Sequence, residues 1–109
     1  YRGDVSVCTA LLAGKADPNL SDKDEESALL FAALHGHEEV AKLLLNSNAN
    51  INHRNHFKDS ALLFAAMSNV GVPQRRSLLA LLLDANADVN HPNDHGKTAL
   101  CNAVEKGGV

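Results

Sequence analysis

Histidines and cysteines are the side chains of this sequence that could bind a metal ion or act as nucleophiles. The histidines form three close pairs, namely His35 with His37, His53 with His56, and His91 with His95. A structural zinc site needs four ligands at short spacings, usually with cysteines among them. Cys8 and Cys101 lie near opposite ends of the chain, and neither has another cysteine or a histidine at chelating distance along the sequence. The spacing therefore predicts no metal site.

Residues suited to acid-base or nucleotide chemistry are also present, but their pattern argues against an enzyme. The acidic run over residues 22–26 is expected on a solvated turn, which offers no pocket to shift a carboxyl pKa. No glycine pattern of the kind that cradles phosphate groups follows a predicted strand. The sequence therefore predicts no catalytic residues and no cofactor.

Composition and charge narrow the class of protein further. The chain has 109 residues, 45% of them hydrophobic, and a formal net charge of −3, which disfavours binding to nucleic acid. Its apolar runs are too short for insertion into a membrane. Two distant cysteines favour a reducing environment, so we expect an intracellular, cytoplasmic protein. Because the sequence opens on Tyr1-Arg2-Gly3 without a leader pattern, we expect it to be part of a longer chain.

An internal repeat is the main feature of the chain. Similar polar segments end at Asn19, Asn52 and Asn90, which are 33 and then 38 residues apart. Similar apolar blocks occupy residues 27–33, 60–66 and 98–104, with the same two spacings. Each block begins with serine or threonine, whose hydroxyl can accept a hydrogen bond from a free amide of the first helical turn. The pattern predicts one helix per block.

The elements within one period predict the fold. An alanine-rich helix is followed by a tight connection such as Gly36-His37, a leucine-rich helix and a linker rich in Asn and Asp. Two helices in every 33 residues predict an all-α solenoid forming one domain. We divide it into a partial unit (1–19), a complete unit (20–52), a complete unit with about five extra residues around 69–74 between its helices (53–90), and a partial unit (91–109). The insertion is expected to be a surface loop, either merely tolerated or in contact with a partner.

This pattern resembles the ankyrin repeat over nearly the whole chain. The resemblance implies stacked helix-turn-helix units with hairpin-like linker turns. Its departures are Ala28, Ala61 and Ala99 in place of proline, and Leu30, Leu63 and Cys101 in place of a histidine that bonds neighbouring turns. These replacements put polar bonding between units in question. The turn glycine is kept only at Gly96, and Glu25 and Lys58 replace it elsewhere, so those turns are expected to be strained or differently shaped.

The resemblance implies a module that binds a partner protein or peptide through its concave face and hairpin tips. The candidate residues are those that vary between units, because stacking explains those that repeat. They are Asp24, Glu26, Leu34, His35, Arg54, His56, Phe57, Asp59 and Met67. Leu34, Phe57 and Met67 are the leading candidates, since apolar side chains facing solvent can anchor a partner. Alternatively, Leu34 and Met67 pack against each other across adjacent units.

Three further expectations follow from the same pattern. The stretch could instead be a structural spacer in a larger scaffold, enzyme or channel whose activity lies elsewhere. The resemblance also implies that a hairpin asparagine can be hydroxylated, and the segment from Leu82 to Asp88-Val89-Asn90 fits the pattern for that reaction, which makes Asn90 a candidate. Cys101 on a first helix and Cys8 on a second helix are expected to be packed between elements.

Overall fold

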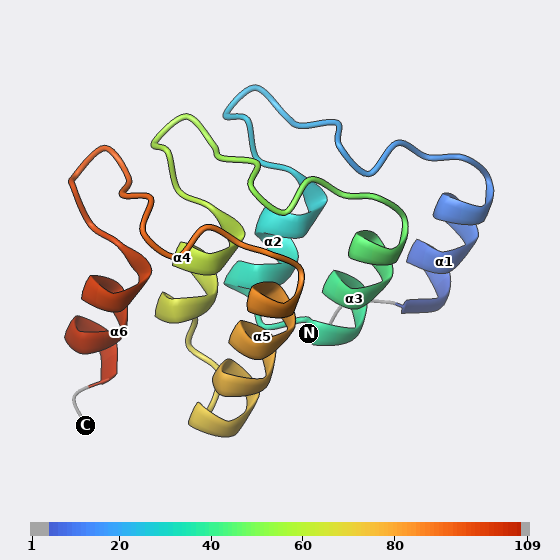
Figure 1. Ribbon diagram of the computed structural model, residues 1–109. Coiled ribbons are helices and arrows are strands. Elements are labelled where there is room, and N and C mark those ends of the chain that lie inside the picture. The colour runs from blue at the N-terminus through green and yellow to red at the C-terminus, as the bar shows by residue number, and fades with distance from the viewer. Residues whose placement is uncertain (1–4, 108–109) are drawn as a thin grey trace.

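The computed structural model describes residues 5–107, with side chains as far as Glu105, and forms a stack of helical pairs (Figure 1). The first four and last two residues, which include Tyr1-Arg2-Gly3 and the outer ends of both partial units, lie outside the described part. The helices are α1 (Val5–Ala13), α2 (Ala28–Leu34), α3 (Glu38–Asn46), α4 (Ala61–Met67), α5 (Val72–Asp84) and α6 (Ala99–Gly107). The predicted all-α solenoid is confirmed.

Two layers of helices make up the stack. The alanine-rich first helices α2, α4 and α6 lie side by side, and the leucine-rich second helices α1, α3 and α5 form the other layer. The linker turns project together along one edge of both layers (Figure 1). Ala33 and Ala65 are completely buried, because small side chains let neighbouring first helices approach closely. Leu44, Leu78 and Leu82 fill the space between the layers.

Serine hydroxyls begin the first helices, as the sequence predicts. The side chain of Ser27 accepts a hydrogen bond from the amide of Leu30 at 3.4 Å, and Ser60 accepts one from Leu63 at 3.3 Å. Both serines have extended backbone conformations, as N-cap residues do. These caps fix where each short helix starts and therefore which of its faces enters the core.

Most of the insertion in the third unit is helical rather than a loop. Helix α5 has 13 residues whereas its equivalent α3 has 9, so four of the extra residues add about one turn to its start. Pro73 lies in this first turn. Proline is favoured there because it lacks an amide hydrogen, and an amide in the first turn would have no partner within the helix. The guanidinium of Arg75 donates to the carbonyl of Ser68 at 3.1 Å and holds the short connection against α5.

The hairpin turns all have one shape, whether or not they contain glycine. Glu25, Lys58 and Gly96 occupy equivalent positions with left-handed φ values of 64°, 67° and 75°. A turn of different shape at Glu25 and Lys58 is therefore the wrong expectation. The turns keep their shape and place two ordinary residues in a conformation that glycine adopts at lower cost.

Replacing Lys58 by glycine is expected to raise the free energy of unfolding by about 0.5–1 kcal/mol. The left-handed conformation disfavours a residue with a Cβ atom, and glycine's greater freedom in the unfolded chain offsets part of the gain. The turn hydrogen bond from the Lys58 amide to the carbonyl of Asn55, 2.9 Å long, is retained. Urea unfolding measures the change.

The matched control is Gly96→Ala, because an added Cβ there meets no atom within 4 Å and only the backbone cost remains. This variant is expected to be less stable than the unmodified chain. A Lys58→Gly variant of lower stability than the unmodified chain would contradict the argument.

Candidate functional site

A ladder of hydrogen bonds joins the hairpin turns of successive units. The side-chain amide of Asn55 donates to the carboxylate of Glu26 at 2.9 Å. One unit later, the amide of Asn93 donates to the carboxylate of Asp59, also at 2.9 Å. Polar bonding between units, which the sequence put in question, is therefore present and uses asparagine instead of the missing histidine. It also engages Glu26 and Asp59 within the stack, although both were candidates for partner contact.

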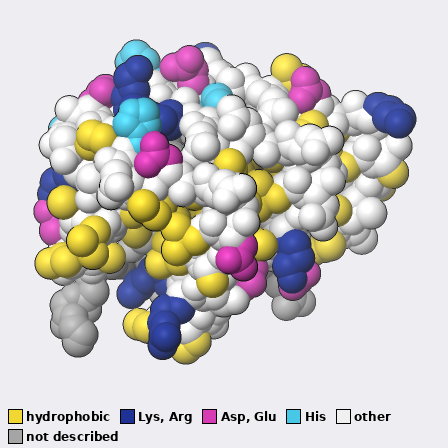
Figure 2. Space-filling view, in the orientation of Figure 1, with side chains coloured by type: hydrophobic (Ala, Val, Ile, Leu, Met, Phe, Trp, Pro, Cys, Tyr) yellow, Lys and Arg dark blue, Asp and Glu magenta, His cyan; other side chains and the backbone are white. Residues whose placement is uncertain are grey.

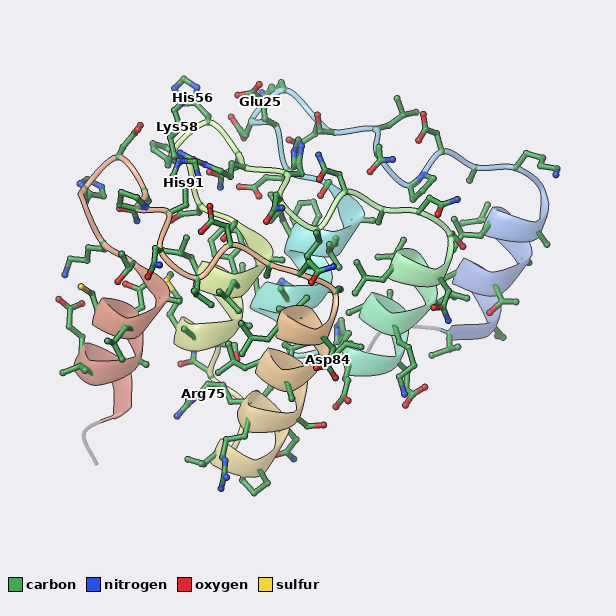
Figure 3. All side chains as sticks on the ribbon, viewed as in Figure 1. Glu25, His56, Lys58, Arg75, Asp84 and His91 are labelled. Carbon is green, nitrogen blue, oxygen red and sulfur yellow. The ribbon has the colours of Figure 1, made fainter. Side chains whose placement is uncertain are left out.

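Backbone bonds connect the turn tips in the same register. The amide of His56 donates to the carbonyl of Asp24 at 3.1 Å, and the amide of Asp94 donates to the carbonyl of Phe57 at 3.0 Å. The candidates Asp24, His56 and Phe57 are thus brought together on neighbouring turns, and the side chains of all three are exposed. Figure 3 labels His56 and Lys58 along this edge, with Glu25 on the adjacent turn.

Phe57 is the apolar group of this edge. Its ring packs edge-on against the ring of His56, with 5.4 Å between centroids, and its side chain remains exposed. The two rings are nearly perpendicular, with 76° between their planes, on a turn whose His56 amide bonds to the carbonyl of Asp24. An edge-to-face pair limits the motion of Phe57 and so reduces the ordering cost of a contact with a partner.

Arg54 points away from the tips. Its guanidinium bonds to the ring of His91 and, at 3.5 Å, to the carbonyl of Pro92, both in the following linker. A small pocket of about 190 Å³ lies there, lined also by Asn52, Ser60 and Asp88. The half-buried Arg54 therefore joins two linkers, and the structure does not bring it together with Phe57.

A groove opens at the other end of the first helices. It has a volume of about 380 Å³ and is lined by Leu34, His35, Met67, Ser68, Asn69 and Val70. Leu34 is half-buried against the core, whereas Met67 is 39% exposed and accepts a hydrogen bond from the amide of Asn102 at its sulfur, 3.4 Å away. Leu34, His35 and Met67, from two successive units, thus share one groove.

The insertion contributes part of this groove, which sequence reasoning missed. Val70 lies so close to Gly36 of the preceding unit that a Cβ added to Gly36 would be 2.3 Å from Cγ1 of Val70. Gly36 also has a left-handed φ of 71°, so glycine is required there for both reasons. The connection that contains Asn69 and Val70 is one residue longer than its equivalent between α2 and α3. The signal that could have found them is the position of the insertion directly after Met67.

Histidines near the groove carry an unusual electrostatic feature. The rings of His35 and His37 lie 6.0 Å apart. Burial, and then the nearby His35, lower the pKa of His37, because burial disfavours the charged form of the ring and His35 disfavours a second positive charge beside its own. Within residues 5–107, no group of three or more His, Cys, Asp or Glu side chains is placed to hold a metal ion.

The two thiols differ in their surroundings. Cys8 is half-buried and packs against the core, as expected, but Cys101 is exposed. Hydrogen bonds with Thr98 lower the pKa of the Cys101 thiol. The expectation that Cys101 is packed is wrong: its equivalents Leu30 and Leu63 are buried, but within the described residues no further helix follows α6 to cover this position.

No curated protein matches the chain significantly. No helix in the described part is long and apolar enough to cross a membrane. A family model for ankyrin repeats in three copies matches residues 1–93. Ankyrin repeats are generally modules for interaction between proteins, and proteins built from them are typically not enzymes in these repeats. The chain belongs to the ankyrin-repeat family.

Proposed function

We propose that this chain is a non-enzymatic, cytoplasmic protein-binding module whose contact surface joins the groove at Leu34 and Met67 to the turn tips at Phe57. The observation that carries the proposal is the groove itself. Two equivalent apolar side chains from successive units line one hollow of about 380 Å³, and Met67 is exposed within it. Exposed apolar groups in a concave site are typical of the anchors that dominate binding energy.

The tips and the groove are close enough for one partner to reach both. They are separated by the length of α4, whose seven residues span about 10 Å, and by the hairpin arm of residues 57–60, which adds up to about 13 Å. An extended peptide of about seven residues covers that distance. Its favoured chemistry is an apolar side chain at each end, with a basic group near Asp24, because the carboxylates of Glu26 and Asp59 are already engaged in the ladder.

The test is affinity capture from cytosolic extract followed by mass spectrometry and measurement of the dissociation constant of the captured partner. The informative variant is Phe57→Glu with Met67→Glu, because both side chains are exposed and their replacement leaves the core intact. Leu34→Glu is added only after circular dichroism shows that the folded state survives, since Leu34 packs against the core. We expect the double variant to weaken binding by about 100-fold, as loss of two anchors implies.

Val89→Glu serves as the matched control. Val89 is also an exposed apolar residue, but it lies in the linker after α5 and outside the groove and tips. A partner that is held equally by all variants would refute the proposed surface. Such a result, together with a full-length protein that works normally with the groove altered, would favour the alternative that these units are structural spacers.

A second function, as a substrate for asparagine hydroxylation, is favoured by one difference among the linkers. The side-chain oxygen of Asn19 accepts a bond from the amide of Asn50 at 2.6 Å, and that of Asn52 accepts one from Asp88 at 3.0 Å. Asn90 is exposed, and the described residues provide no such bond to its side chain. An enzyme therefore reaches Asn90 without breaking a hydrogen bond between linkers.

In this reaction one atom of O₂ enters a C–H bond of the Asn90 side chain, and a two-electron reductant with two protons converts the other atom to water. Treatment with an asparaginyl hydroxylase followed by peptide mass spectrometry should find one added oxygen at Asn90 and less at Asn19 and Asn52. An unmodified Asn90 would reject this function.

A further inference from the structure

Arg75 places a positive charge beside the groove. Its Nη1 donates to the carbonyl oxygens of Ser68 and Val70, at 3.1 and 3.4 Å. Both of those residues line the groove that also contains Leu34 and Met67. Figure 3 shows the Arg75 side chain reaching from the start of α5 towards the end of α4. The guanidinium therefore lies next to the apolar side chains that we propose as anchors for a partner.

No carboxylate of the described chain neutralises this charge. The ion pairs among the described residues join Lys42 to Glu39 and Lys97 to Glu105, and Arg75 belongs to neither. The carbonyl oxygens that it contacts are neutral acceptors, so the guanidinium keeps its whole charge although its side chain is half-buried. Half-buried charges are normally paired. A cation without a counter-ion beside an apolar hollow therefore favours a ligand that carries an anionic group.

The guanidinium of Arg75 also keeps one edge open. A guanidinium has two N–H groups on each Nη atom and one on Nε. The carbonyls of Ser68 and Val70 use Nη1, and no described residue accepts a hydrogen bond from Nε or Nη2. Unlike Nε of Arg54, neither of these two atoms is buried. Two adjacent N–H groups of this kind can donate parallel bonds to one carboxylate, and the carbonyl bonds hold them in place before a ligand arrives.

The surroundings of Arg75 favour the same kind of ligand. The first turn of α5 contains no acidic residue and Arg76 follows Arg75, whereas the equivalent helix α3 begins with Glu38 and Glu39. Figure 2 shows Lys or Arg side chains beside hydrophobic ones at the lower end of the view, where α5 begins. On the α2 side of the groove, His35 is exposed, and its ring N–H can donate to an anion. Apolar and hydrogen-bond-donating groups therefore occur together at this end of the surface.

We propose that Arg75 binds a side-chain carboxylate of the partner, so that the segment filling the groove carries an aspartate or glutamate next to its apolar anchor. This inference rests on the protein-binding function proposed above and specifies the chemistry of the partner. At the other end of the surface, Asp24 favours a basic group. The two charges together fix the direction in which the segment crosses α4, because the opposite direction places like charges against each other.

The probe is a library of random peptides of about 12 residues displayed on phage, which is long enough to reach from the groove to the tips. It is selected on the 109-residue chain. Peptides that no longer bind the variant with Phe57→Glu and Met67→Glu occupy the proposed surface, and we expect an acidic residue beside an apolar one to be enriched among them. Peptides of this group without that enrichment would overturn the carboxylate site and leave the groove. A library without such a group would refute the proposed surface and the role of Arg75 with it.

Calorimetric titration then measures the coupling between Arg75 and the peptide carboxylate. One selected peptide, with both ends blocked, is compared with an analogue in which the amide replaces its acidic side chain. On the unmodified chain the analogue should bind about tenfold more weakly, because it loses charge-assisted hydrogen bonds. On Arg75→Gln the two peptides should agree within about twofold. Arg75→Lys keeps the charge but not the two parallel bonds, so we expect a preference of about threefold.

Arg76→Gln is the matched control. It removes the same charge one residue further along α5, and the exposed side chain of Arg76 bonds to no described residue. This variant should keep the preference of about tenfold for the acidic peptide. A preference that survives Arg75→Gln, or one that falls equally in both variants, would overturn the assignment of the carboxylate to Arg75.

A spectroscopic measurement decides the point if circular dichroism shows that Arg75→Gln has lost its fold, since Arg75 also holds the connection after α4. The Nε–H signal of Arg75 in the NMR spectrum of the unmodified chain is identified by its absence from the spectrum of Arg75→Lys. It should shift when the acidic peptide is added and stay in place with the amide analogue, because only a carboxylate forms the charged pair. Equal shifts with both peptides would overturn the proposal.

Discussion

Replacing Asn55 by aspartate is expected to lower the free energy of unfolding by about 2–4 kcal/mol at neutral pH. Asn55 is buried, and its side-chain oxygen accepts bonds from the amides of Phe57 and Asp59 at 2.9 and 3.0 Å. Its nitrogen donates to the carboxylate of Glu26. Aspartate keeps both accepted bonds but loses the donor, and it brings a second carboxylate about 3 Å from the first.

The chain contains its own controls for this change. Asp22 has a carboxylate at the equivalent position and makes the same turn, accepting bonds from the amides of Asp24 and Glu26 at 2.9 and 3.0 Å. An aspartate is therefore compatible with the turn itself. The expected loss of stability in Asn55→Asp comes from the Glu26 carboxylate that faces the new aspartate. Asn93→Asp, opposite Asp59 at a half-buried position, should cost less than Asn55→Asp.

Urea unfolding at neutral and acid pH measures the effect and its cause. Protonation of one carboxyl restores a hydrogen-bond donor between the pair, so the difference between Asn55→Asp and the unmodified chain should shrink as the pH falls. A difference that is the same at pH 7 and pH 4 would mean that the loss does not arise from the facing carboxylates.

Periodicity and local chemistry predicted the fold from the sequence. The 33-residue spacing, the serines before each apolar block and the alternation of alanine-rich and leucine-rich helices depend on residues close together in the chain. Ser27 and Ser60 cap their helices as expected, because a cap needs only the amide three residues later. The positions of the first helices followed directly.

Features that depend on contacts between units were predicted poorly. Asn55 bonds to Glu26, 29 residues away, and no local pattern distinguishes that pair from other polar residues of the turns. The same reasoning placed Glu26 and Asp59 on the binding surface, whereas the ladder uses them. Cys101 was expected to be packed, but burial at this position depends on neighbouring elements and not on its own helix: its equivalents Leu30 and Leu63 are buried and Cys101 is exposed.

The groove also combines positions that the sequence predicted with contacts between units that it did not predict. The sequence identified Leu34 and Met67 as equivalent positions but left open whether they face solvent or each other. In the structure both line one groove, with Leu34 half-buried and Met67 exposed. Val70 also lies against Gly36 on one side of the groove, and an insertion has no repeat register from which its contacts could be predicted.

Leu62→Ala is expected to lower the free energy of unfolding by about 2–5 kcal/mol, the range for a buried leucine that leaves a cavity. Leu62 lies on α4, which contacts α2, α5 and α6, so a cavity there weakens the coupling of every unit to the central one. For a domain with a total stability of about 5–15 kcal/mol, this is a large share.

Leu100→Ala is the matched comparison, since it removes the same atoms at the equivalent position of α6. Leu100 is 73% exposed, so the variant should differ from the unmodified chain by less than about 0.5 kcal/mol. Urea unfolding of both variants measures burial at the two positions. Equal losses for Leu62→Ala and Leu100→Ala would contradict the exposed face of α6.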